Sequence, residues 1–294
     1  MNPRARNRSF AVAIGVALVL AACRKPPEPA APSGTVSVAA GQSSVEAGAP
    51  IEIEYRFARL ARGAALPADA WVFVHVVDAA GALLWTDDHE PPTAPATWGD
   101  AEVTYRRPMF VPRTASPGPV RVEAGVFSRA DGARVPMTVA GNPAAGGFEV
   151  TAASNDLFVV FGDGWHGAER VEQQQANEWR WSTGDARLSF RRPQRDVVLS
   201  LEIDQPVMAV GRQTAELRVG SDLLATLAID PGVRRIHRVA LPAARLGSAP
   251  TLELDVHVRP TFVPASITGL ASSDTRELGV RVFNVHVGAG LRAP

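Results

Sequence analysis

The sequence predicts an all-β protein with two β-sandwiches, an immunoglobulin- or fibronectin-like domain followed by a jelly-roll-like domain. Short apolar runs separated by glycine and proline recur along the 294 residues. Several runs alternate strictly, as in residues 51–57 (Ile-Glu-Ile-Glu-Tyr-Arg-Phe), where one face is apolar and the other mostly charged. A period of two is typical of a half-buried strand. No credible amphipathic helix accompanies these runs, which favours sandwiches over an α/β fold.

The first 22 residues have the composition of a secretory signal. Arg4, Arg6 and Arg8, with no acidic residue among them, precede an apolar run of 13 residues at positions 10–22. A permanent transmembrane helix needs about 20 apolar residues. We therefore expect a signal peptide over residues 1–22 rather than a membrane span.

The four residues Leu-Ala-Ala-Cys that end at Cys23 contain the only cysteine of the chain. This stretch resembles the cleavage signal of bacterial lipoproteins, although the small residues Ala21 and Ala22 also suit plain secretion. The resemblance implies that Cys23 becomes the first mature residue and carries a diacylglyceryl group and an N-linked acyl chain such as palmitate. It also implies a lipid anchor in the bacterial cell envelope. Because Arg24 and not Asp follows, the family pattern favours the outer membrane, facing the periplasm or the cell surface.

Charge and cysteine usage exclude several functions. Removing residues 1–22 takes away three arginines and no acidic residue, which leaves 27 basic and 30 acidic residues and a net charge of −3. Nucleic acid is therefore not the expected partner. With Cys23 lipidated, no disulfide, cysteine-ligated zinc or thiol nucleophile remains. We predict no cofactor and no metal, and the 272 mature residues suggest two domains of ordinary size.

Residues 23–33 are expected to form a tether. Four prolines fall within residues 24–33, and they fix φ and remove backbone donors. At ~3.1 Å per residue in polyproline II geometry, the tether would reach about 30 Å from the membrane. A role as a peptide ligand is the alternative.

The first sandwich is predicted over residues 34–153. Its expected strands are residues 35–40, 51–57, 71–77, 83–86, 102–111, 120–127, 134–139 and 148–151. Residues 78–81 (Asp-Ala-Ala-Gly) and 129–132 (Arg-Ala-Asp-Gly) supply turns between paired runs. Residues 142–147 are a loop before the last strand.

The second sandwich is predicted over residues 154–294. Its expected strands are residues 157–161, 178–182, 187–190, 197–203, 215–219, 223–229, 235–241, 252–258 and 278–287. Residues 217–223 predict a hairpin with Gly-Ser at its bend. Residues 171–177 contain helix formers but are too few and too polar for more than a loop with one turn.

Three of the six tryptophans fall within residues 165–181, among charged side chains. Trp165 lies in a glycine-rich loop, where an exposed indole could stack on the C–H face of a sugar while neighbouring polar groups bind hydroxyls. Trp179 and Trp181 alternate onto one face, so we expect both to belong to the core. The candidate ligand-binding residues in this stretch are Trp165, His166, Glu169 and Arg180.

Asp274 and Arg276 complete the candidate site from a second cluster, residues 259–264 and 273–280. Both clusters resemble accessory β-sandwich domains of bacterial surface-polysaccharide proteins and membrane glycosyltransferases. The resemblance implies a carbohydrate-associated setting and no particular reaction. In the alternative interpretation, Asp274 and Arg276 pair with each other, together with Glu169, and pin the final loop to the sandwich.

The first sandwich has its own polar cluster, residues 87–90 (Asp-Asp-His-Glu), with Trp98 and Asp100 beyond. Carboxylates and an imidazole could hold a hard cation or act as acid and base, but the spacing matches no metal loop, and charged strand ends are usually solvated. Residues 73–78 through 88–90 also resemble sandwich domains attached to membrane glycosyltransferases, which implies no settled activity.

Signatures of common enzyme classes are missing, including the Gly-x-Ser-x-Gly elbow, the His-Glu-x-x-His helix and phosphate-binding glycine loops. The prediction is a membrane-anchored, non-enzymatic binding or assembly lipoprotein, with a glycan or an envelope protein as partner. Two alternatives stay open. One is an envelope glycan hydrolase or lyase that uses paired carboxylates such as Glu169 and Asp274. The other is a purely structural lipoprotein.

Overall fold

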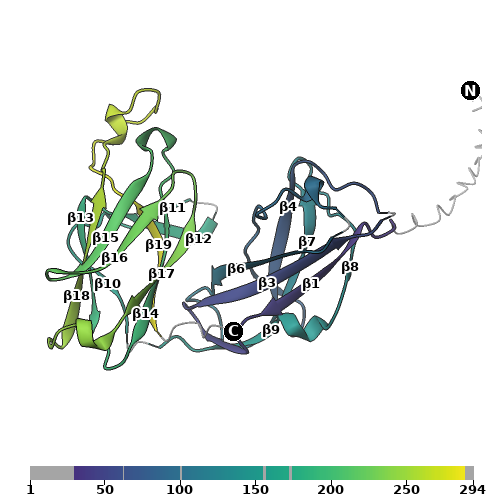
Figure 1. Ribbon diagram of the computed structural model, residues 1–294, viewed down its shortest axis with the longest axis horizontal. Coiled ribbons are helices and arrows are strands. Elements are labelled where there is room, and N and C mark those ends of the chain that lie inside the picture. Colours follow the sequence, from purple (N-terminus) through teal and green to yellow (C-terminus); the bar gives the residue numbers. More distant parts are fainter. Residues whose placement is uncertain (1–29, 62, 100, 155–156, 172–173, 289–294) are drawn as a thin grey trace, which may run out of the picture. The chain divides into compact units, whose positions relative to one another are not determined.

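The computed structural model describes residues 30–61, 63–99, 101–154, 157–171 and 174–288 (Figure 1). The predicted signal peptide, Cys23 and most of the predicted tether lie outside these residues. Within the described ranges, no helix is long and apolar enough to cross a membrane. The predicted fold class is confirmed, because almost all regular structure consists of strands packed as two β-sandwiches.

The first sandwich contains a four-stranded and a five-stranded sheet. The four-stranded sheet has the order β6 (Val103–Phe110), β3 (Pro50–Arg59), β1 (Gly34–Ala40) and β8 (Met137–Val139). The five-stranded sheet has the order β2 (Ser44–Glu46), β9 (Gly147–Thr151), β7 (Gly118–Ser128), β4 (Ala70–Asp78) and β5 (Leu83–Thr86). β1 and β2 follow one another closely but join opposite sheets, so the first segment of the domain fastens the two layers together.

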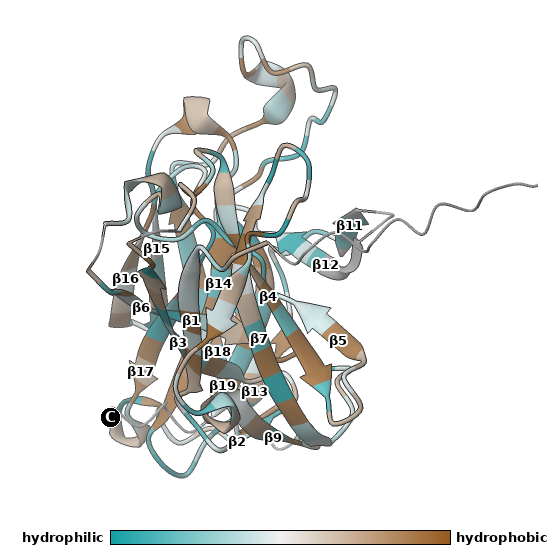
Figure 2. Cartoon of the chain, turned by 90° about the vertical axis from the view of Figure 1, so that its right-hand side faces the viewer, coloured by the Kyte–Doolittle hydropathy of each residue, from teal (hydrophilic) through white to brown (hydrophobic). Residues whose placement is uncertain are grey.

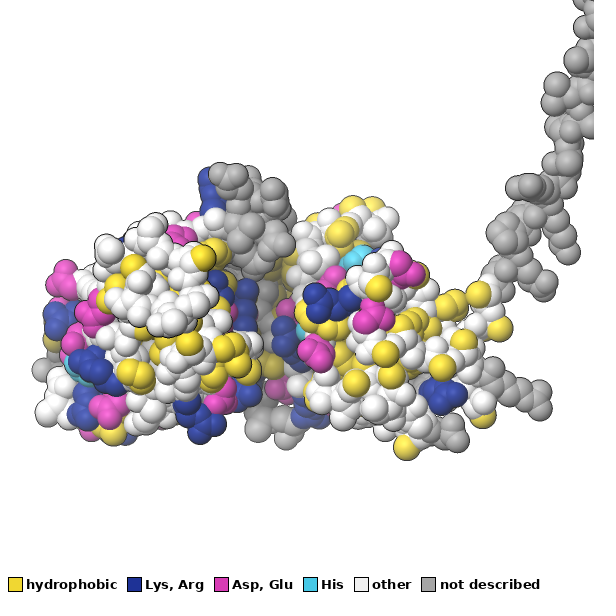
Figure 3. All heavy atoms as spheres, turned by 90° about the horizontal axis from the view of Figure 1, so that it is seen from above, with side chains coloured by type: hydrophobic (Ala, Val, Ile, Leu, Met, Phe, Trp, Pro, Cys, Tyr) yellow, Lys and Arg dark blue, Asp and Glu magenta, His cyan; other side chains and the backbone are white. Residues whose placement is uncertain are grey.

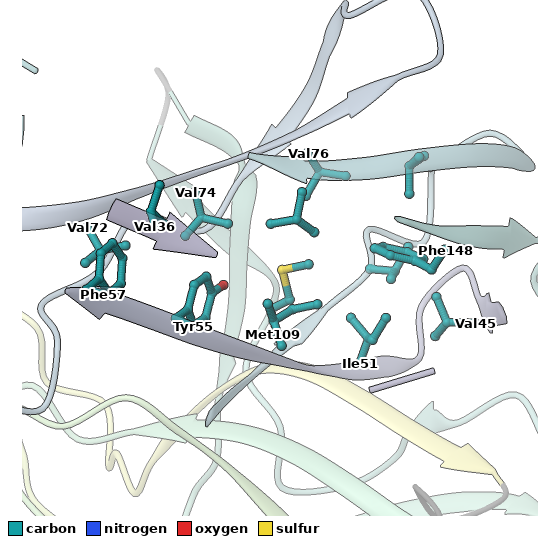
Figure 4. Packing of buried hydrophobic residues seen from close by; sticks show 14 of the residues in the cluster. Val36, Val45, Ile51, Tyr55, Phe57, Val72, Val74, Val76, Met109 and Phe148 are labelled. Atoms are coloured by element: carbon teal, nitrogen blue, oxygen red, sulfur yellow. The ribbon is translucent and has the colours of Figure 1, made fainter. Parts of the chain in front are cut away.

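The alternation in β3 builds the core of the first sandwich. Ile51, Ile53, Tyr55 and Phe57 are fully buried. Figure 4 shows Ile51, Tyr55 and Phe57 pointing into the core. They belong to the same cluster as the inward residues of β4, which are Val72, Val74 and Val76. Burying each large apolar side chain contributes about 1.5–3 kcal/mol, so this face fixes the register of the sheet.

The second sandwich contains two five-stranded sheets. One has the order β10 (Val160–Phe161), β13 (Asp185–Arg191), β18 (Thr251–Arg259), β15 (Gln213–Val219) and β16 (Asp222–Ile229). The other has the order β11 (Glu169–Val171), β12 (Gln174–Trp181), β19 (Arg281–Gly288), β14 (Val197–Asp204) and β17 (Arg235–Leu241). Leu188, Leu199, Leu217, Leu241 and Leu254 are among the fully buried residues between them.

Turn chemistry places several strands as predicted. Val219 pairs with Asp222, so Gly220 and Ser221 form the two-residue bend of the β15–β16 hairpin, with Gly220 at φ 57°. Asp78 accepts hydrogen bonds from the N–H groups of Ala80 and Ala82 in the β4–β5 turn. The strand β7 shows the alternation of hydrophobic and hydrophilic residues in Figure 2.

Helical structure in the described ranges is limited to short 3₁₀ turns. They are η1 (Pro95–Thr97), η2 (Pro143–Gly146), η3 (Met208–Val210), η4 (Ala243–Arg245) and η5 (Pro264–Ser266). η2 occupies the loop predicted at residues 142–147, where the side chain of Asn142 accepts a hydrogen bond from Ala144 N–H. Each turn connects strands and adds no layer to the sandwiches.

Three segments differ from their predictions. The prediction of a loop at residues 171–177 is wrong. β11 ends at Val171, β12 begins at Gln174, and these two residues pair. Residues 172 and 173 lie outside the described ranges. Pairing in the sheet overrides the helix propensity of glutamine there. Two strands are shorter than predicted. The strand predicted at residues 134–139 is limited to β8, with a single isolated bridge between Arg134 and Phe127, and the strand predicted at residues 157–161 is limited to β10.

Candidate functional site

The glycine-rich loop between β10 and β11 is held tightly against β13. Gly164 has φ 77°, and a Cβ atom there would lie 2.0 Å from the carbonyl oxygen of Asp185 and 2.6 Å from Cα of Ala186. Only glycine permits this conformation and this approach of two backbones. The loop therefore presents Trp165 and His166 in fixed positions at the edge of the second sandwich.

Trp165 is partly buried. Its indole meets the ring of Phe161 edge-on, with 4.9 Å between ring centroids, and its Nε1–H donates to the carbonyl oxygen of Arg187 at 2.8 Å. The side chain packs against the core of the second sandwich. Its polar atom is thus already satisfied by backbone, and the indole mainly secures the loop.

His166 and Arg180 lie next to this tryptophan. His166 N–H donates to the carbonyl oxygen of Trp181, and its Nε2 lies 2.9 Å from the carbonyl oxygen of Glu277. Arg180 Nη1 reaches the carbonyl oxygen of His166 at 3.4 Å, and its guanidinium lies 5.2 Å from the centre of the Phe161 ring. Both side chains therefore join the glycine-rich loop to neighbouring segments.

Arg276 is the centre of the candidate site. Its Nε and Nη2 donate to the two carboxylate oxygens of Asp274, at 3.0 and 2.7 Å, and its Nη1 pairs with Glu169 Oε1 at 2.7 Å. The pairing predicted as the alternative interpretation is confirmed, and it joins β11 to the loop before β19. The side chains of Arg276, Glu169 and Asp274 remain 39%, 32% and 25% exposed, so the cluster also faces solvent.

Asp274 is strongly acidic. The side chain of Arg276, followed by its backbone N–H, lowers the pKa of Asp274 from its ordinary value to about 2, because both stabilise the ionised form. His166 contributes in the same direction. Asp274 is therefore a carboxylate at neutral pH, able to accept hydrogen bonds and not to supply a proton.

Trp179 and Trp181 lie together, but outside the main core of the second sandwich. They belong to a small separate cluster with Phe262 and Leu278, in which the rings of Trp181 and Phe262 meet edge-on at 5.7 Å. The guanidinium of Arg281 lies 5.0 Å from the ring centre of Trp179 and 5.7 Å from that of Trp181. Trp181 is buried, whereas Trp179 is only partly buried.

A second charged group, which no local sequence pattern reveals, is formed by Asp185, His257 and Arg259. Asp185 accepts from His257 Nδ1 at 2.6 Å and from Arg259 Nη2 at 2.9 Å. Both partners lower the pKa of Asp185, and the hydrogen bond with His257 has the largest effect. His257 and Asp185 are opposite one another on β18 and β13, and only the register of the two strands reveals the pair. Figure 3 shows the same kind of arrangement on one face of the molecule, where positively charged side chains and carboxylates lie next to one another.

The polar cluster of the first sandwich has separate partners for its side chains. Asp88 accepts from Val74 N–H, and Asp87 pairs with Arg107 at 2.9 Å. His89 is only 5% exposed, and its ring nitrogens contact the carbonyl oxygen of Asp87 at 2.9 Å and the hydroxyl of Tyr105 at 2.8 Å. Among the described residues, no group of three metal-ligating side chains occurs.

Acid is expected to destabilise the first sandwich through His89. Burial, and then the charge of Arg107, lower the pKa of His89 from 6.5 to about 4. Between these two pH values the imidazole is protonated in the unfolded state and neutral in the folded state. Stability therefore falls as pH decreases from 6.5 to about 4, by about 3 kcal/mol in total. Urea unfolding of the wild type and the His89→Gln variant across this range measures the difference. Parallel pH curves for the two proteins would contradict the prediction.

Comparisons with known proteins give partial likenesses only. No protein-family model matches the chain, and no curated protein does. Among solved structures, a carbohydrate-binding module, CBM36 in complex with calcium and xylotriose, matches 44% of this chain and 93% of its own at 9% identity and a TM-score of 0.26. CsCBM6-3 from Clostridium stercorarium in complex with cellobiose matches 46% and 95%, at 9% identity and 0.28. Exo-β-1,3-galactanase from Phanerochaete chrysosporium matches 80% and 54%, at 10% identity and 0.32.

Proposed function

We propose that the chain is a lipid-anchored, non-enzymatic binding protein of the bacterial cell envelope, and that its second sandwich contacts a carbohydrate. One observation supports this proposal most directly. Arg276 forms ion pairs with both Asp274 and Glu169, and all three side chains remain partly exposed to solvent. His166 and Arg180 flank the same surface through the glycine-rich loop. The fold thus presents donors and acceptors side by side in one fixed arrangement.

Such an arrangement suits hydroxyl groups. A hydroxyl donates one hydrogen bond and accepts others, so it can bridge a carboxylate and a guanidinium. Hydrogen bonds to charged groups are stronger than neutral ones. Because the ion pairs already hold the side chains in place, binding would cost little additional ordering. Trp165 supports the site by fixing the loop.

The same geometry favours binding over hydrolysis. A glycosidase needs a carboxylic acid whose raised pKa keeps a proton available for the leaving group. The pKa of Asp274 is instead lowered to about 2. Glu169 and Asp274 also both contact one guanidinium, which occupies the position between them. The pair therefore resembles a recognition element more than an acid and a nucleophile.

The lipid anchor is proposed from the sequence alone. It rests on the signal that ends at Cys23 and on the proline-rich residues that follow. Several acyl chains together give stable membrane attachment, since each buried CH₂ contributes about 0.8 kcal/mol. The Cys23→Ala variant, expressed in a Gram-negative host, should lose incorporation of labelled palmitate and leave the membrane fraction. Unchanged labelling or fractionation of that variant would refute the anchor.

Binding is tested with detergent-solubilised full-length protein on an array of envelope polysaccharides. We expect the Arg276→Gln variant to bind about tenfold more weakly or worse, because it loses the charge and the fork that the site presents. The matched control is Arg245→Gln in η4, where Arg245 forms a bidentate ion pair with Asp222 away from both loops. Absence of binding by the wild type, or equal loss in both variants, would count against a carbohydrate site at Arg276.

A further inference from the structure

The outer face of the β5–β4–β7 sheet carries a row of aromatic side chains. Val72, Val74 and Val76 of β4 point into the core of the first sandwich, so the alternate residues Trp71, Phe73 and His75 lie on the opposite face. Phe127 of β7 is the cross-strand partner of Trp71 on that face. A surface usually places polar residues at such positions, so this row is unexplained by folding alone.

Gly125 shapes this face. It is the cross-strand partner of Phe73, and a Cβ atom there would lie 2.5 Å from the Phe73 ring. The phenyl ring therefore extends over the backbone of β7, in space that any larger residue would fill. At this position the aromatic ring is therefore packed against the sheet.

Two arginines cover the row. The guanidinium of Arg129 lies 4.2 Å from the ring centre of Trp71, and that of Arg134 lies 4.3 Å from the ring centre of Phe73. Arg134 Nη2 is also 3.3 Å from His75 Nδ1. Both arginines are exposed, and stacking on an aromatic ring holds a guanidinium while leaving its N–H edge free to donate.

The carboxylates nearby have partners other than the Arg129 and Arg134 guanidinium groups. Asp69 accepts from the Ser128 hydroxyl and from Ala130 N–H, and Asp131 accepts from Ala133 N–H. Glu123 pairs with Arg121 at 2.6 Å. Within the described part of the chain, no carboxylate forms an ion pair with Arg129 or Arg134. Glu123, the cross-strand partner of His75, lies on this face but is paired with Arg121. The face therefore carries two guanidinium groups that form no ion pair, beside an aromatic row.

We propose that this face binds an acidic polysaccharide, with Arg129 and Arg134 as forks for the carboxylates of uronic-acid units. Charge complementarity selects an anionic ligand, and planar bidentate recognition suits a carboxylate. The aromatic row selects a ligand with flat C–H faces, such as a sugar ring. Outward residues of a strand are spaced about 6.7 Å apart, so the row along β4 follows an extended polymer. The surface lies in the first sandwich and does not depend on the site at Arg276.

The test uses detergent-solubilised full-length protein, titrated calorimetrically with a hexamer of galacturonic acid. We expect binding that weakens with salt, about tenfold or greater loss in the Arg129→Gln/Arg134→Gln double variant, and no binding of a neutral galactose hexamer. Arg106→Gln is the matched control, because Arg106 is an exposed arginine of β6 whose charge is already neutralised by Glu54. It should bind as the wild type does.

Two further measurements distinguish specific recognition of a carboxylate from non-specific attraction of polyanions. The Arg129→Lys/Arg134→Lys double variant keeps the charge and loses the forks, so it should bind much more weakly than the wild type. Full affinity in that variant, or equal affinity of the wild type for poly-L-glutamate, would overturn the proposal in favour of non-specific attraction of polyanions. Lack of uronate binding would overturn it as well, and would leave the site at Arg276 untouched, since the two experiments change different residues.

Discussion

Replacing Gly164 with alanine is expected to destabilise the second sandwich by about 3 kcal/mol or more. The left-handed backbone conformation at φ 77° already costs a residue with Cβ about 1–2 kcal/mol. The new methyl group would also lie 2.0 Å from the carbonyl oxygen of Asp185, and backbone cannot rotate away as a side chain can. Urea unfolding gives the change in free energy, and the polysaccharide array should show reduced binding because the loop shifts.

Gly167 in the same loop provides the control. No heavy atom lies within 4 Å of the position that its Cβ would take, and its φ is not positive. Gly167→Ala should therefore change the free energy of unfolding by no more than about 0.5 kcal/mol. Equal stability of the two alanine variants would show that the loop does not approach β13 as closely as described.

Replacing Asp204 with alanine is expected to cost about 3–5 kcal/mol, because it strands a buried positive charge. Arg281 donates to both carboxylate oxygens of Asp204 at 2.7 and 2.6 Å, and the two side chains are only 20% and 10% exposed. Without Asp204, the guanidinium would remain beside Trp179 and Trp181 with little water and no counter-charge. Urea unfolding at pH 7 measures the loss.

A double variant separates the lost ion pair from the stranded charge. Asp204→Ala/Arg281→Met removes both charges and should regain most of the stability, because an apolar side chain of similar length can fill the space between the rings. The exposed pair between Arg245 and Asp222 offers a comparison, and Asp222→Ala should change stability little. If the double variant were as unstable as Asp204→Ala, packing rather than charge would explain the effect.

Local patterns sufficed to predict most of the strands. The alternation at residues 51–57 predicts β3 because only a strand places Ile51, Ile53, Tyr55 and Phe57 on one side. Gly-Ser at residues 220–221 predicts a hairpin because its two-residue bend needs a positive φ. These signals arise within a few residues and do not depend on distant partners.

Other features depend on contacts that no local pattern encodes. β2 and β11 have three residues each, too few to show a period. The ion pair between Glu169 and Arg276 joins segments far apart in sequence, so the residues suggested it only as one of two interpretations. Trp165 was expected as a platform because it lies among glycines, yet its indole N–H bonds to the backbone of β13. Likewise, only the register of β13 and β18 reveals the Asp185–His257 pair.

The ends of the sheets also bear on how copies of this protein behave in crowded solution. In the described structure, the edge strands β2, β5, β8, β10 and β11 have only two to four residues each. Three edges are longer. β6 contains Arg106, Arg107 and Pro108, and proline cannot donate a backbone hydrogen bond. β17 contains two arginines among its seven residues, whereas β16 has eight residues with Asp222 as its one charged side chain. Unpaired backbone at a sheet edge is what recruits further strands into aggregates. A neighbouring copy would gain few hydrogen bonds by adding to the five short edges. Strand-by-strand association would therefore be most favourable at β16, which is long and carries one charged residue.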